Sequence, residues 1–209
     1  MHRRLRLTAS ISKSISSAVD RWKPEFVASK DKDQLLSKLL PPSRVNQLKG
    51  IKITARSLEY GRMNESTALK AYLEKHRSDG CPDAVIEKSG LVLCKEYPAI
   101  GASPDGILKC SKHGQRLVEV KCPSSCENIS VYAADYMDAD KKCIRRNIYA
   151  DQLLVQMACT GVHSCDLFIW SQKDFHIEEC QFSEQAWENM EENLKWFYRN
   201  VVLRKFLSE

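Results

Sequence analysis

The chain has 209 residues, of which 43% are hydrophobic and 28% are charged, and its formal net charge is +5. This length fits one domain with a sizeable core, and the sequence shows no internal repeat and no low-complexity tail. No apolar run approaches the length of a membrane span, and the N-terminus lacks the apolar core of a signal peptide. We therefore expect a soluble intracellular protein, in the nucleus or the cytoplasm, without a membrane partner.

The nine cysteines form an odd count in a chain large enough to build an ordinary core. Such usage favours buried free thiols in a reducing compartment over a disulfide scaffold.

The positive charge is concentrated at the front of the chain. Residues 1–62 carry 14 Lys and Arg against 5 Asp and Glu, whereas the remainder carries 18 against 22. A basic front half beside an acidic site is typical of a protein that binds a polyanion such as DNA, although a merely solvated basic face has the same charge.

The N-terminal segment places Arg3, Arg4 and Arg6 directly before Leu-Thr-Ala-Ser at 7–10. Apolar residues then recur every four positions from Leu7, which predicts a helix that begins at Thr8 or Ser10. Arginines beside hydroxyl groups make a good phosphate pocket, and a frayed basic terminus is the alternative.

The next stretch is rich in lysine and has a short leucine-rich helix that should end at Pro41-Pro42. We predict no catalytic residue in it. Residues 1–209 are expected to form one domain, whose basic helical part, about 1–56, acts as a lid or a DNA-facing arm.

A clear helical pattern covers residues 53–76 and contains the candidate Glu65. Glu65 lies three residues before Ala68 and four before Leu69, so it borders the apolar face of the helix, where a carboxylate needs a partner. An ordinary surface pairing with lysine is the alternative.

The centre of the chain carries the strongest candidate site. Strands are predicted at 85–87 and 91–94, then a Ser-Pro-Asp-Gly turn that contains Asp105, and then a strand at 117–120. Residues two apart in a strand share a face, so Glu119 and Lys121 project together, and pairing of 106–109 with 117–121 would bring Asp105 close to Glu119. Two adjacent carboxylates need a cation, and oxygen ligands favour Mg²⁺, while the lysine could orient or deprotonate a water. A surface turn with an incidental salt bridge is the alternative.

The remainder supplies further elements of the same domain. A helix is predicted from Tyr149 to Gly161 with Gln152 and Gln156 on it, followed by strands at 165–170 and 175–179 and a long amphipathic helix capped by Ser183. The predicted fold is an α/β sandwich around a small mixed sheet. A helix-surface glutamine is the alternative to a functional one.

These motifs resemble those of the PD-(D/E)xK nucleases. The longer segments GASPDGIL and LVEVKCP resemble one branch of that superfamily, the YqaJ-type viral recombinase or lambda-exonuclease-like family. The resemblance implies a restriction-endonuclease-like core and a metal site that Asp105, Glu119, the Val120 carbonyl and Glu65 form. It assigns Lys121 and Gln152, which follows Tyr149 in a Tyr-x-x-Gln motif, to catalysis. Leu154 departs from the family, many members of which have a second glutamine there. The residues implied at the 5′-phosphate of the DNA are Arg3 or Arg4, Ser10 and Ser103.

The activity implied by the resemblance is that of a Mg²⁺-dependent exonuclease, with Mn²⁺ as a substitute, that resects double-stranded DNA ends from 5′ to 3′ in recombination or repair. Such enzymes are often ring-shaped trimers and pass the 3′ strand to a single-strand annealing protein. The alternatives are an endonuclease or repair nuclease of the same superfamily, and a DNA-end-binding or zinc-stabilised protein without turnover.

A rival metal site consists of Cys110, His113, Cys122 and Cys126, whose spacing is tolerable for zinc. Two of its members lie in the segment 109–116 between the two acids, which has no role in the nuclease mechanism.

Overall fold

The main sheet of the protein has five strands and is mixed. The structure is a computed structural model that describes residues 5–51, 55–134, 136–143 and 146–207. The strand order is β2-β5-β6-β7-β8, with β6 and β7 parallel and the other neighbours antiparallel. The strands are β2 (Val85–Glu87), β5 (Gly106–Cys110), β6 (Gly114–Lys121), β7 (Ser164–Trp170) and β8 (Phe175–Gln181).

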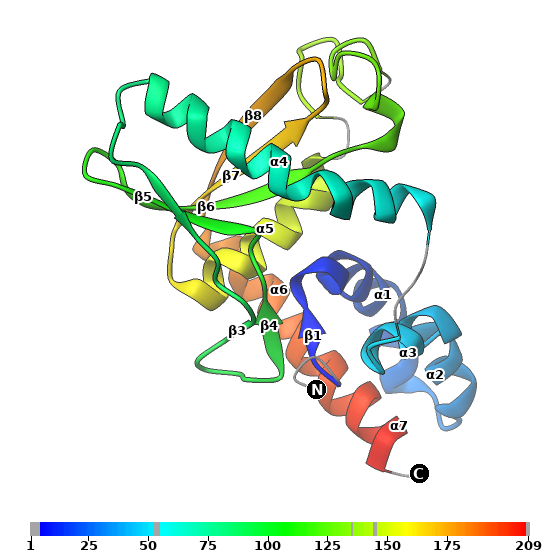
Figure 1. Cartoon of the computed structure of the whole chain (residues 1–209). Coiled ribbons are helices and arrows are strands. Elements are labelled where there is room, and N and C mark those ends of the chain that lie inside the picture. Colours follow the sequence, from blue (N-terminus) through cyan, green and yellow to red (C-terminus); the bar gives the residue numbers. More distant parts are fainter. Residues whose placement is uncertain (1–4, 52–54, 135, 144–145, 208–209) are drawn as a thin grey trace.

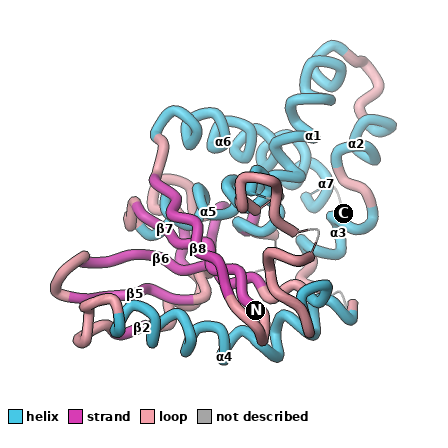
Figure 2. Tube along the Cα trace, turned by 90° about the horizontal axis from the view of Figure 1, so that it is seen from above, coloured by secondary structure: helices cyan, strands magenta, loops and turns pink. Residues whose placement is uncertain are grey.

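Helices cover both faces of this sheet (Figures 1 and 2). Helix α4 (Arg56–Ser78) buries Tyr72 against Phe168 on one face, and helix α5 (Arg146–Thr160) packs its apolar side chains, such as Leu153, on the other. Strand β6 therefore contributes Val118 to one core and Leu117 to the other. This arrangement confirms the expected restriction-endonuclease-like α/β fold class.

A second, three-stranded sheet has the order β1-β4-β3. Strand β1 (Leu7–Thr8) runs parallel to β4 (Ile100–Ala102), and β3 (Val92–Leu93) runs antiparallel to β4. Sequence analysis predicted a strand for β3 but not for β1 or β4, because strands of two and three residues are too short to show periodicity. The pairing brings the N-terminal motif beside the segment that leads into Asp105.

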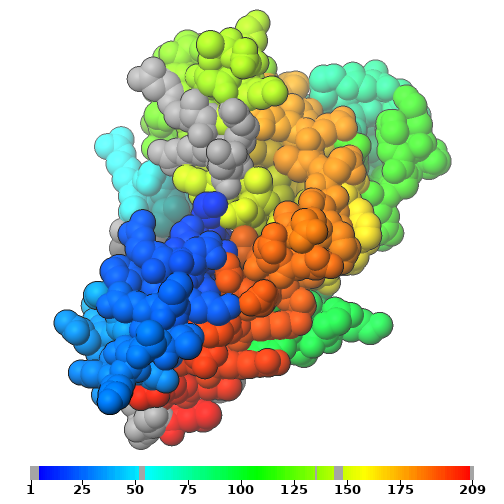
Figure 3. Space-filling view, turned by 180° about the vertical axis from the view of Figure 1, so that it is seen from behind, coloured from blue at the N-terminus to red at the C-terminus, as the bar shows by residue number. Residues whose placement is uncertain are grey.

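The N-terminal helices pack against the C-terminal ones, as the blue and red segments of Figure 3 show. They are α1 (Ala9–Ala28), α2 (Asp33–Leu39) and α3 (Pro42–Leu48) at the front, and α6 (Glu184–Phe197), the π-helical turn Tyr198–Val202 and α7 (Leu203–Leu207) at the end. The rings of Phe26 and Trp196 meet edge to face, with centroids 5.4 Å apart. No helix among the described residues is long and apolar enough to cross a membrane.

The long elements agree with the sequence predictions within a few residues. Ser183 caps α6 by accepting a hydrogen bond from the Ala186 N–H, as expected. Helix α2 ends before the two prolines, but the chain then resumes in α3, with Pro42 as its first residue. Proline is favourable there because its missing N–H would have no intrahelical partner. A single-turn 3₁₀ helix follows the site at Ser124–Cys126.

Candidate active site

Asp105 and Glu119 lie opposite one another at the end of the β5–β6 ladder. In this ladder Gly106 pairs with Val118, so the register places the residue before Gly106 beside the residue after Val118. The Asp105 Oδ2 accepts a hydrogen bond of 2.8 Å from the Val120 N–H, which fixes the carboxylate against β6. The predicted approach of the two acids is therefore confirmed.

The glycine after Asp105 is required by close packing. A Cβ atom at Gly106 would come within 2.6 Å of Ile86 Cγ2 and 3.1 Å of Val118 Cγ1. Only glycine lets β2, β5 and β6 meet this closely at the point where Asp105 leaves the strand. This is a local reason for the Asp-Gly pair in the motif.

Glu119 is the centre of a buried hydrogen-bond network. Its Oε1 accepts hydrogen bonds from Lys121 Nζ at 2.5 Å and from Gln152 Nε2 at 2.6 Å, and its Oε2 accepts one from Gln156 Nε2 at 2.7 Å. Lys121 also contacts Gln152 Oε1 at 3.4 Å and lies over the Tyr149 ring at 4.9 Å. The structure thus brings together four polar residues that were selected from the sequence: Glu119, Lys121, Gln152 and Gln156.

The environment of Asp105 favours its protonated form when no cation is present. Burial, followed by the nearby Glu119 carboxylate and more weakly by Glu65, raises the pKa of Asp105 to about 8. Burial works against the charged form of Lys121, but Glu119 and Asp105 outweigh it and the pKa of Lys121 lies above its ordinary value. The site therefore holds a charged lysine whose effect on the pKa of Asp105 is smaller than that of burial and of Glu119.

The donor set fits a hard divalent cation. Glu65 approaches Asp105 closely enough to affect its pKa, and Glu65, Asp105 and Glu119 line the same two cavities. The carboxamide oxygen of Gln156 is buried and has no hydrogen-bond partner. Oxygen ligands and uncompensated negative charge are what Mg²⁺ requires. The three carboxylates do not all bring an oxygen within 4.8 Å of one another, so one ion held by all three would require a side chain to rotate.

The first cavity, of about 370 Å³, joins the acids to the N-terminal motif. Ser10 and Ser103, both selected from the sequence, line it together with Glu65, Asp105, Glu119 and Gln152. It is also lined by Lys88, which sequence analysis did not single out. Lys88 lies in a short loop after β2, and nothing in its local sequence distinguishes it from other surface lysines.

The predicted phosphate-binding arginines, Arg3 and Arg4, lie outside the described residues. Arg6, which follows them, donates a hydrogen bond to the Pro98 carbonyl. The part of the N-terminal motif that the structure describes at the cavity is therefore Thr8 to Ser10, and the hydroxyls of Thr8 and Ser10 lie 3.2 Å apart.

The second cavity, of about 510 Å³, lies on the other side of the same acids. It extends from Glu119, Val120 and Lys121 to Arg62 on α4 and to Tyr149 on α5. Val120 thus borders the site, as expected of a residue whose carbonyl was assigned to the metal. The acids stand at the boundary between two openings, which is an arrangement that could let a polymer pass across them.

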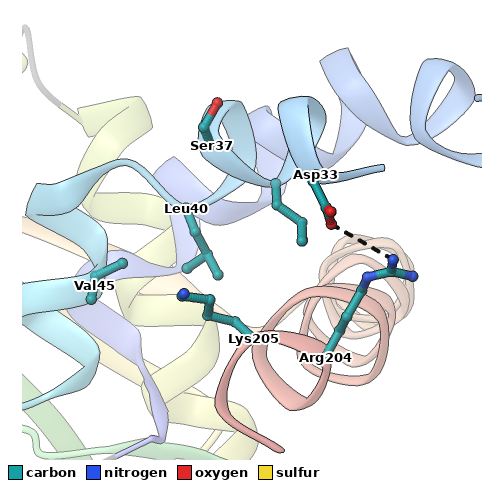
Figure 4. A pocket seen from close by; sticks show the side chains of 7 residues that line it. Asp33, Ser37, Leu40, Val45, Arg204 and Lys205 are labelled. Carbon is teal, nitrogen blue, oxygen red and sulfur yellow. Dashed lines mark ion pairs between the residues drawn. The ribbon is translucent and has the colours of Figure 1, made fainter. Parts of the chain in front are cut away.

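The larger hollow in Figure 4, of about 820 Å³, lies elsewhere, between α2, α3 and α7. Asp33 pairs with Arg204 across it at 3.7 Å, and Leu36, Leu40 and Val45 line it. It contains none of the site carboxylates, so its size does not make it the active site.

The four-residue zinc site considered from the sequence is wrong. Cys122 follows Lys121 at the acidic end of β6 and Cys126 lies in the core under α5, whereas Cys110 and His113 lie at the opposite end of the hairpin. The spacing in sequence was tolerable, but the length of β6 separates the two halves.

The comparisons with known proteins agree with this geometry. Residues 1–163 match the family described as the YqaJ-like viral recombinase domain. The chain belongs to this family. The match runs from the N-terminal segment through α5, and it includes every site residue named above. No curated protein matches the chain.

Solved structures similar to this YqaJ-like chain include exonucleases. The alkaline exonuclease (LHK-Exo) from Laribacter hongkongensis is 18% identical with a TM-score of 0.67, and the similarity covers 99% of this chain and 93% of that one. Its complex with dAMP gives a TM-score of 0.66 at 18% identity, with coverage of 99% and 95%. A phage-related exonuclease from Haemophilus somnus 129PT is 10% identical with a TM-score of 0.60, and 97% of each chain is covered. At these identities the likeness establishes the fold of the YqaJ-like domain.

Proposed function

We propose that the protein is a Mg²⁺-dependent deoxyribonuclease, a 5′-to-3′ exonuclease on double-stranded DNA ends that acts in recombination or repair. The observation that carries this proposal is the meeting of Asp105, Glu119 and Lys121 at one point, where both acids line two cavities and the lysine lines one of them. The family membership and the exonuclease fold support the same reaction class.

In this proposal Asp105, Glu119 and the Val120 carbonyl hold the metal, and Glu65 binds the same ion or a second one. A bound Mg²⁺ or Mn²⁺ supplies a Lewis acid that polarises the phosphodiester and stabilises the attacking and leaving oxygens. The raised pKa of Asp105 supports this assignment because a cation relieves the same repulsion that otherwise retains a proton.

The remaining polar side chains orient the reactants. Lys121, whose pKa is raised, donates hydrogen bonds as an ammonium group to the attacking water and the phosphate. Gln152 fixes Lys121 through its Oε1 and fixes Glu119 through its Nε2. Gln156 Nε2 donates a hydrogen bond to the second oxygen of Glu119, Oε2. Each contact limits the freedom of a group that must face the scissile bond.

The cavity lined by Ser10, Ser103 and Lys88 is the proposed site for the terminal 5′-phosphate. Hydroxyl donors and an ammonium group suit a phosphate dianion, and Arg3 or Arg4 is assigned to the same phosphate from the family motif. A phosphate held there would set the next phosphodiester over the acids, which supports the 5′-to-3′ direction. We further propose that the chain forms one domain, that it assembles as a homotrimer, and that it passes the 3′ strand to a protein that anneals single strands.

The test is digestion of an end-labelled linear duplex with Mg²⁺, with and without a 5′-phosphate. We expect release of nucleotides from the 5′ end, slower attack on 5′-hydroxyl ends, and no attack on a closed circle. Asp105→Ala and Lys121→Ala should abolish turnover. Equal degradation of the circle would refute the exonuclease, and activity that survives both substitutions would refute the site.

A further inference from the structure

A second group of potential metal ligands lies away from the carboxylates. Cys81, Cys110 and His113 are the one set of three or more His, Cys, Asp or Glu side chains in the described residues whose ligand atoms all lie within 4.8 Å of one another. The His113 Nδ1 is 3.2 Å from Cys81 Sγ and 3.5 Å from Cys110 Sγ. Both thiols are buried, while the imidazole is exposed.

These separations match those around a tetrahedral zinc ion. With Zn–S bonds of about 2.3 Å and Zn–N bonds of about 2.1 Å, a tetrahedral angle separates sulfur from nitrogen by about 3.6 Å. The observed distances of 3.2 and 3.5 Å agree with that value to within a few tenths of an ångström. The imidazole nitrogen therefore already lies at nearly the distance from each sulfur that a shared zinc ion requires.

The local backbone holds the ligands in place. The His113 N–H donates to Cys110 Sγ at 3.3 Å, which fixes the sulfur against the hairpin turn. The Ser111 N–H donates to Asp83 Oδ2 at 2.7 Å, which ties the hairpin turn to the loop that carries Cys81. That loop turns at Gly80, whose φ of +94° is accessible to glycine at little cost.

We propose that Cys81, Cys110 and His113 bind a zinc ion, with a water molecule as the fourth ligand. Sulfur and imidazole ligands select zinc over Mg²⁺, and two thiolates neutralise its charge. Cys110 ends the strand that begins just after Asp105, so about five residues at 3.4 Å each, about 17 Å, separate the zinc from the carboxylates.

The position of the zinc indicates a structural role. Cys81 follows the end of α4, Cys110 ends β5, and His113 immediately precedes β6. Glu65 lies in the middle of the same helix, Asp105 immediately precedes β5, and Glu119 lies near the far end of β6. The ion would clamp the helix to the hairpin, and so hold together the elements that position the acids.

A disulfide between the two cysteines is the competing interpretation. Both cysteines are free in the structure. A disulfide would leave the contacts of His113 Nδ1 with both sulfurs without a role.

The test is titration of the reduced full-length protein with Co²⁺, followed by competition with Zn²⁺. We expect one ion per chain and an absorption band from thiolate-to-cobalt charge transfer, which oxygen ligands cannot produce. His113→Ala, Cys81→Ser and Cys110→Ser should each lose or shift the band and lose stoichiometric zinc. The exposed position of His113 makes that variant the one best suited to remain folded, as circular dichroism would verify.

Two matched controls separate this site from the rest of the chain. Cys180→Ser removes a free cysteine outside the cluster, and Asp105→Asn alters the carboxylate site. Both should retain the band and the zinc. Absence of the band in the reduced wild-type protein, an unchanged band in the ligand variants, or isolation of a Cys81–Cys110 disulfide in place of zinc would each overturn the proposal.

Discussion

Gln156 donates a hydrogen bond of 2.7 Å to Glu119 Oε2, and the two side chains are only 1% and 4% exposed. The bond satisfies a carboxylate oxygen that Lys121 and Gln152 do not reach, because both of them bind Oε1. Gln156, one helical turn beyond Gln152 on the buried side of α5, therefore helps to hold the Glu119 carboxylate in place.

Replacement of Gln156 by Leu should destabilise the protein, since it leaves a buried oxygen of Glu119 without a donor. The expected loss is about 1–3 kcal/mol of unfolding free energy, measured by urea denaturation. Gln185→Leu, on the exposed face of α6, is the control and should change stability by less than about 0.5 kcal/mol. Equal losses in the two variants would show that the bond to Glu119 contributes nothing.

Replacement of Lys121 by Met should lower kcat by about 10²-fold or more while the protein stays folded, because it removes the group proposed to orient the water. The control is Lys109→Met in the neighbouring strand β5. Lys109 forms an ion pair of 2.7 Å with Glu87 and takes no part in the proposed site. Initial rates on a linear duplex at saturating Mg²⁺ provide the measurement. A Lys121 variant with the activity of the Lys109 variant would exclude this role.

The metal-free protein should lose stability as the pH rises from about 4 towards 8. Asp105 has a pKa of about 8 in the folded chain and an ordinary value near 3.8 when unfolded, so in this range the folded state binds the extra proton. Stability therefore falls with increasing pH, and Asp105→Asn should remove that contribution. Thermal unfolding in EDTA across this range, compared between the two proteins, measures it.

The same proton competes with the cation for Asp105. Mg²⁺ affinity should therefore increase with pH up to about 8 and level off above it. Calorimetric titration at several pH values tests this relation, and an affinity that does not change between pH 6 and 8 would contradict it.

Replacement of Lys88 by Ala should reduce the preference for 5′-phosphorylated ends, because it removes the ammonium group that lines the cavity with Ser10 and Ser103. We expect the ratio of rates on 5′-phosphate and 5′-hydroxyl duplexes to approach one. The exposed Lys95→Ala is the control, since Lys95 does not line this cavity. An undiminished ratio in the Lys88 variant would place the phosphate elsewhere.

Sequence patterns were enough to predict the grouping of Asp105, Glu119 and Lys121, because the geometry of this group is local. The alternation of a β-strand puts Glu119 and Lys121 on one face, and a short hairpin returns Asp105 to them. The helical period likewise predicted that Glu65 borders a buried face and that Gln152 and Gln156 lie one turn apart.

The distant residues that join this group follow from long-range packing. The pairing of β1 with β4 brings Ser10 to the acids, although neither strand is long enough to show a sequence pattern. The loop after β2 brings Lys88, which nothing in the local sequence distinguishes from other surface lysines. The cysteines show the same limit. Spacing allowed Cys122 and Cys126 as partners of Cys110 and His113, but the length of β6 separates them, and the turn after α4 supplies Cys81 instead.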